Sequence, residues 1–173
     1  MILSRVLVVA WTMLVASSSV FAQEQDHASF LSGMVKQVIL DPTTYAPAIV
    51  AWEATRLDWR SSQSFFQHGL LEHNSRFTVS GRGDDIAISY GAGNRQILWD
   101  AMANLQVSLV HNVTDRVIER VLLRRHPQHP TLVRTIGWIE RSAVASYLSY
   151  RQSAGHFRQW QENDRLARQL GYD

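Results

Sequence analysis

One run of sequence constrains the fold more than any other. Residues 94–125 contain neither glycine nor proline, and apolar residues recur along the run at steps of three and four, which fit a helix and not a strand. These residues are Leu98, Met102, Leu105, Leu109, Val113, Val117 and Val121. A second face carries Asp100, Asn104, Ser108, His111, Asp115 and Glu119. The pattern predicts one long helix with an apolar face toward the core and a second face that carries the chemistry.

The N-terminus has the features of a secretory signal peptide. Arg5 precedes an apolar run at 6–16, and small polar residues lead to the small-x-small pattern that ends at Ala22. We therefore expect residues 1–22 to be a signal peptide and the mature protein to be periplasmic or secreted. The alternative is an uncleaved membrane anchor, although the apolar run is shorter than the ~20 residues that span a bilayer.

Length and composition narrow the class of protein. The chain has 173 residues, so we expect a single domain over 23–173 with an insert at 70–93. It has no cysteine, which excludes disulfides and thiolate metal sites. The formal net charge is +2 and falls to about +1 without Arg5, so no strong field attracts nucleic acid.

The remaining segments predict a mainly α fold. A short amphipathic helix ends before Pro42, a second helix capped by Thr43 or Thr44 runs to about His68, and a third begins near Pro130 and reaches Gly171. Between them, residues 77–80 and 86–90 alternate like strands around a glycine-rich turn. We expect a bundle of three long helices and one short N-terminal helix, with a small β-hairpin or ordered loop as the insert.

The candidate chemical residues begin on the long helix. His111 and Asp115 are four residues apart and share one face, which Glu119 extends. An imidazole and a carboxylate at this spacing can ligate a cation or act as base and orienter. These three residues are the candidate metal ligands, and a divalent metal is the cofactor they would hold. The other candidate catalytic residues are Asp58, Glu72, His73 and His156.

Two interpretations of this face stay open. Buried polar groups need hydrogen-bond partners, so the histidine and the acids can form an internal network that fixes helix register. The sequence contains no GxSxG and no SxxK nucleophile motif. Our first hypothesis is an exported structural or interaction protein of the cell envelope without catalytic activity. The alternative is a metal- or acid/base-dependent hydrolase that uses the histidine–aspartate face.

A basic region spans the end of the long helix and the residues that follow it. It contains Arg120, Arg124, Arg125 and Arg134, with His126 and His129 between them. Arginines near an anionic membrane contribute ~1 kcal/mol each to binding. The partners we consider are therefore an anionic membrane surface or another envelope protein, and not nucleic acid. The alternative is a solvated end of the bundle.

From about Asp41 onward the chain resembles a group of bacterial exported proteins that have no assigned activity. The segments that carry the resemblance are LDPTTYAP, HGLLEHNSRFTVSGR, YGAGNRQILWD, HNVTDRVIER, RTIGWIER and SAGHFRQW. The segment LDWRSSQSFFQHGLLEHN is also similar, more faintly, to small helical membrane proteins, from which the chain departs by its charged helices. Neither resemblance implies an activity or a functional residue.

Overall fold

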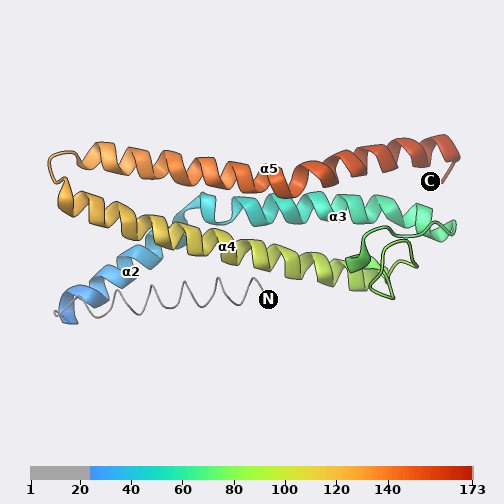
Figure 1. The fold of residues 1–173 in the computed structure, drawn as a ribbon, viewed down its shortest axis with the longest axis horizontal. Helices are drawn as coiled ribbons and strands as arrows, with labels where there is room; N and C mark the ends of the chain where they lie inside the picture. Colours follow the sequence, from blue (N-terminus) through green and yellow to red (C-terminus); the bar gives the residue numbers. More distant parts are fainter. Residues whose placement is uncertain (1–23, 173) are drawn as a thin grey trace.

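The computed structural model describes residues 24–172, so the predicted signal peptide lies outside the described residues. The helices are α2 (Glu24–Leu40), α3 (Ala46–Gln67), α4 (Tyr90–Arg125) and α5 (Pro130–Leu170), with 3-10 turns η1 (Pro42–Thr44) and η2 (Ser75–Phe77). Helices α4 and α5 form a long antiparallel hairpin, and α3 lies along the half farther from its turn (Figure 1). The predicted mainly α bundle of three long helices and a shorter N-terminal one is confirmed.

The helix ends follow the local sequence with one exception. Helix α2 ends just before Pro42, which lacks an N–H to continue it, and Gly171 ends α5 with a φ of 70°. The expectation that Thr43 or Thr44 caps α3 is wrong, because α3 begins at Ala46. The Thr44 hydroxyl instead donates to the Val38 carbonyl at 2.8 Å. This bond ties the end of α2 to the start of α3.

The insert between α3 and α4 is an ordered loop and not a hairpin. Within the described residues it has no β-strand, only isolated bridges between Glu72 and Asp85 and between Thr78 and Ala87. The 3-10 turn η2 interrupts the first alternating segment, and the Thr78 hydroxyl bonds to the Ser75 and Arg82 carbonyls. Local side-chain bonds of this kind offer the backbone an alternative to strand pairing. The ordered-loop form of the prediction therefore holds.

The loop completes a small apolar core at one end of the bundle. Trp59 of α3, Phe77 of the loop and Ile97 of α4 are buried together, and the Trp59 and Phe77 rings lie 5.0 Å apart. The Trp59 indole N–H donates to the Tyr90 carbonyl at 3.3 Å. The backbone of Gly93 lies against the same ring, so α3 and α4 approach closely here.

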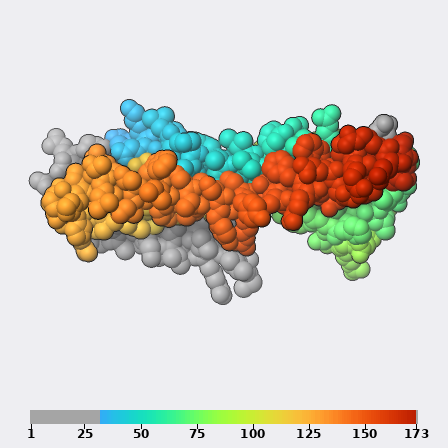
Figure 2. Space-filling model, turned by 90° about the horizontal axis from the view of Figure 1, so that it is seen from above, coloured from blue at the N-terminus to red at the C-terminus, as the bar shows by residue number. Residues whose placement is uncertain are grey.

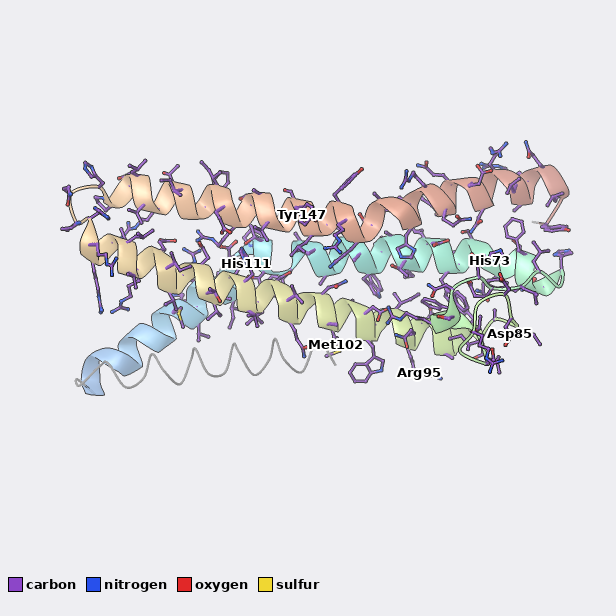
Figure 3. The ribbon with its side chains drawn as sticks, viewed as in Figure 1. His73, Asp85, Arg95, Met102, His111 and Tyr147 are labelled. Carbon is purple, nitrogen blue, oxygen red and sulfur yellow. The ribbon has the colours of Figure 1, made fainter. Side chains whose placement is uncertain are left out.

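The prediction that the apolar face of α4 points to the core is wrong. Leu98, Met102, Leu109, Val117 and Val121 are all exposed and Leu105 and Val113 are half-buried, whereas the buried α4 positions beyond the small apolar core are polar. They are Ser108 and Asn112. Periodicity shows that a helix has two faces, and the polar face turned inward because groups on α5 and η1 satisfy it. Figure 3 shows Met102 projecting away from the bundle.

None of the described helices has the length and sustained hydropathy needed to cross a membrane.

The contact at Gly93 gives a direct test of the packing. A Cβ added at Gly93 would lie 2.2 Å from the Trp59 ring, so Gly93→Ala should destabilise the fold by about 1–3 kcal/mol through overpacking. Gly155 of α5 is the matched control, because a Cβ there meets no atom within 4 Å. Gly155→Ala should stabilise the helix by up to about 1 kcal/mol. Urea unfolding measures both, and equal effects of the two variants would contradict this packing.

Candidate functional site

A buried charge cluster joins η1, α4 and α5. It consists of Asp41, Asp115, Arg116, Glu119 and Arg141. The Arg141 side chain is only 3% exposed. Its guanidinium donates to the Asp115 carboxylate and, at 3.0 Å, to Glu119 Oε2, and its Nε lies 3.2 Å from Asp41 Oδ2. Arg116 donates to the same Asp41 oxygen at 2.9 Å, so three carboxylates surround two guanidinium groups.

The sequence makes room for this cluster with a glycine. Gly137 lies one helical turn before Arg141 and is buried. A Cβ at Gly137 would come within 3.0 Å of Glu119 Oε2 and 3.1 Å of Arg141 Nη1. A neutral layer of hydrogen bonds continues the cluster, because the Asn112 amide donates to the hydroxyls of Thr43 at 2.9 Å and Thr44 at 2.7 Å.

Electrostatics in the cluster favour its charged forms. Burial by itself would raise the pKa of Asp41, but hydrogen bonds from Thr43 and the charges of Arg141 and Arg116 outweigh it and hold that pKa below its ordinary value. Burial opposes the charge on Arg141, while its hydrogen bonds to Glu119 and Asp115 raise its pKa. The cluster is therefore an ion network whose partners stabilise one another.

The predicted pair of His111 and Asp115 is not formed. Asp115 turns to Arg141, and His111 Nε2 lies 3.3 Å from Glu140 Oε1 of α5 without hydrogen-bond geometry. The third candidate metal ligand, Glu119, is also bonded to Arg141. Among residues 24–172, no group of three or more histidine, aspartate or glutamate side chains is placed to hold a metal ion. A divalent metal in this protein stays a prediction of the sequence alone.

A second polar cluster joins α3 and α5 beside a cavity. His156 Nδ1 lies 2.7 Å from Asp58 Oδ2, and the buried Asn163 amide donates to the hydroxyls of Ser61 at 3.1 Å and Ser62 at 3.0 Å. These contacts line or border a cavity of about 480 Å³. Its apolar walls are Trp59, Phe65, Phe66, Leu70, Leu71, Phe77 and Leu166. The pair thus lies at a cavity with both apolar and polar walls.

The chemistry available to the Asp58–His156 pair is narrow. A carboxylate on Nδ1 fixes the imidazole ring and leaves its other nitrogen for a second partner. The hydroxyls of Ser61 and Ser62 both donate to the Asp58 backbone carbonyl, at 2.9 and 3.0 Å, and the Thr55 hydroxyl donates to Ala51. These nearby hydroxyls are engaged with the α3 backbone and not with the imidazole. The pair can orient a base, and it also fastens α5 to α3.

The loop brings two further candidates to the same cavity. Glu72 and His73 both line it. The Glu72 carboxylate accepts from the Asn74 backbone N–H at 2.7 Å, and the exposed His73 ring bonds to Asp84. The six candidate catalytic residues therefore divide into two places. Asp58, His156, Glu72 and His73 meet at the cavity, and His111 and Asp115 lie elsewhere along the bundle.

Sequence reasoning did not identify Arg141, Asp41 or Asn163 as members of these clusters. A weak signal existed for the first, because Gly137 and Ala145 flank Arg141 at one turn on either side and both are buried. Small residues around a lone charge on one helix face indicate a buried charge. Asp41 was assigned only to the end of a helix, and nothing near Asn163 in the sequence indicates a partner on α3.

Comparison of the chain with known protein families, with curated proteins and with solved structures returned no match. The clusters are therefore interpreted from their own geometry.

The charge cluster predicts a large effect of removing its central cation. Arg141→Met leaves the carboxylates of Asp115 and Glu119 without their buried partner, and breaking a buried pair costs about 3–5 kcal/mol. The matched control is Arg165→Met, which removes an exposed ion pair with Glu162 and should change stability little. Urea unfolding of both variants measures the difference. A similar small loss in both would show that Arg141 does not hold the carboxylates.

The lowered pKa of Asp41 predicts the direction of pH dependence. Because its folded pKa lies below the ordinary value of 3.8, its contribution to stability is complete above 3.8 and is lost as pH falls toward the folded pKa. Asp41→Asn should therefore be less stable than the wild type at neutral pH, and its stability should decline less steeply below pH 3.8. Unfolding midpoints across this range measure the two slopes. Parallel slopes would contradict the assignment.

Proposed function

We propose that this chain is an exported structural or interaction protein of the cell envelope, without catalytic activity, that presents apolar helix faces to another molecule. The observation that carries the proposal is the distribution of large apolar side chains. On α4 the exposed ones are Tyr90, Leu98, Trp99, Met102, Val107, Leu109, Val110, Val117, Ile118, Val121 and Leu122. On α5 they are Leu132, Ile136, Trp138, Ile139, Tyr147, Tyr150 and Leu170.

Part of this surface extends along most of α4. Leu98, Met102, Leu109, Val117 and Val121 recur at helical spacing, so they form a stripe about 35 Å long at 1.5 Å per residue. We call these five residues the α4 stripe. Soluble monomers seldom expose contiguous apolar patches beyond a few hundred Å², and larger ones mark protein or membrane contacts. The stripe therefore supports a function in which another surface covers this face.

The interior supports the same function. The charge cluster and the Asn112 layer use directional bonds between α4, α5 and η1, which fix the rotation of α4 about its own axis. Hydrogen-bonded polar networks specify helix register, and this one does so through the bonds just named, while the buried Nε atoms of Arg116 and Arg141 have no hydrogen-bond partner. The orientation of the α4 stripe is thereby held by bonds that the inner residues of the same helix make, and a partner would meet a preformed surface.

The hydrolase alternative stays a prediction. The cavity at Asp58 and His156 is where an acid/base activity would reside, since it joins an oriented histidine to a sizeable hollow. The neighbouring hydroxyls of Ser61 and Ser62 are bonded to backbone, which favours the interaction function over nucleophilic catalysis.

The α4 stripe supplies the test. Changing Leu98, Met102 and Leu109 together to Gln should leave the unfolding midpoint nearly unchanged, because all three are exposed, and should release the protein from the complex that it forms in gently extracted cell envelopes. Native electrophoresis and crosslinking measure complex size.

The control variant changes three equally exposed apolar residues outside α4 and α5. Ile49→Gln, Val79→Gln and Ile86→Gln remove similar apolar area from α3 and the loop. This variant should keep the complex intact. A wild-type protein that is a lone chain in envelope extracts, or a complex lost equally in both variants, would contradict the proposed function.

A further inference from the structure

We propose that one end of the bundle docks on an anionic lipid surface. The end consists of residues 117–139, which include the last turns of α4, the short connection and the first turns of α5, and we call it the α4–α5 tip. It is the outermost part of the hairpin at one pole of the elongated molecule (Figures 1 and 2). This inference rests on the proposed function, because it names the partner of one part of the apolar surface.

The tip is strongly basic. Arg120, Arg124, Arg125 and Arg134 fall within it, and its one acidic residue, Glu119, accepts a hydrogen bond from Arg141. The other pole differs, because its described basic residues alternate with acids. There Arg165 pairs with Glu162, Arg168 with Asp164 and Arg76 with Asp100. Charge is therefore separated along the rod, and the tip is the pole that is complementary to an anionic surface.

The tip also exposes large apolar side chains from both helices. Those on α4 are Val117, Ile118, Val121 and Leu122, and those on α5 are Leu132, Ile136, Trp138 and Ile139. Trp138 is 60% exposed. Tryptophan and branched aliphatic residues combined with arginine are the composition of surfaces that enter the headgroup region of a bilayer.

The two kinds of residue alternate in space. Arg134 lies one helical turn from Trp138, and Arg125 lies one turn from Val121. Each arginine can therefore lay its aliphatic stem along a neighbouring apolar side chain and place its guanidinium on lipid phosphate. The connection is short and closed by Pro130 at the first turn of α5, so both helix ends reach the surface together.

A lipid surface fits these residues better than two other partners. A nucleic acid backbone would engage the arginines but would leave the exposed Ile136, Trp138 and Ile139 without a contact. A second copy of the chain docked tip to tip would bring like charges together, since an isologous contact places the same patch on both sides. An anionic bilayer satisfies both the charges and the apolar side chains.

The experiment uses the protein as it is isolated from cells, after any cleavage of the predicted signal peptide. Binding is measured by co-sedimentation with vesicles of phosphatidylcholine alone and with vesicles that also contain phosphatidylglycerol. The unaltered protein should bind the second kind, and salt should weaken the binding. Arg125→Gln with Arg134→Gln should weaken it about 25-fold, because each basic residue near an anionic surface contributes roughly fivefold.

The matched control removes the same charge elsewhere. Arg151→Gln with Arg158→Gln changes two exposed arginines of α5 outside the tip and should leave vesicle binding nearly unchanged. Leu132→Gln with Ile139→Gln tests the apolar part and should weaken binding even in salt that screens the arginines. Circular dichroism of each variant verifies the helical fold.

Four results would overturn the inference. They are equal binding to the two kinds of vesicle, equal losses in the tip and control variants, no binding at all, and self-association in solution that the tip variants abolish. None of these depends on the residues Leu98, Met102 and Leu109 that test the proposed function. If changing those three residues disrupts the envelope complex while the tip variants have no effect, the proposed function stands. The apolar surface is then assigned to a protein partner.

Discussion

The burial of the Arg141 guanidinium among three carboxylates is the interaction on which the rest of the structure depends. Removing a cation from water costs several kcal/mol, and attraction offsets this cost only when partners are close and well oriented. Asp41 comes from the turn before α3, while Asp115 and Glu119 come from α4. One side chain of α5 therefore fixes the position of two other segments, and the long hairpin has a single register in which this site is complete.

This use of the interior determines where apolar side chains lie. Polar groups occupy inner positions of α4 at Ser108 and Asn112, so most of the large apolar residues of that helix beyond Ile97 lie on the outer face. The apolar core is correspondingly small and sits where the loop covers Trp59 and Ile97 at one end. The molecule thus combines an apolar anchor near the loop with ionic contacts, hydrogen bonds and small buried residues such as Ala51, Ala54 and Ala145 along the remaining length, and many of its large apolar side chains face outward.

The sequence predicted the helices well and their orientation poorly, for one physical reason. Helical periodicity in α4 shows that apolar and polar residues occupy different faces. The same spacing results whichever face points into the bundle, so periodicity does not give the orientation. Orientation depends on partners from distant segments. Asp115 meets Arg141 from 26 residues away, and His156 meets Asp58 from 98 residues away. Such pairings do not appear in local spacing, so His111 and Asp115 were grouped by helix face, although Asp115 bonds to Arg141 and His111 lies beside Glu140.

Because many large apolar side chains of this bundle point outward, folding and docking are thermodynamically coupled. Apolar burial is the main driving force for folding in water, and here many large apolar side chains stay outside the folded chain. A molecule that covers the α4 stripe or the α4–α5 tip binds the folded form, in which those side chains are aligned, and not the unfolded form. Binding of this kind stabilises the fold in proportion to the logarithm of ligand concentration over its dissociation constant. The polar interior then specifies the shape, and the covering surface contributes the burial that the interior lacks.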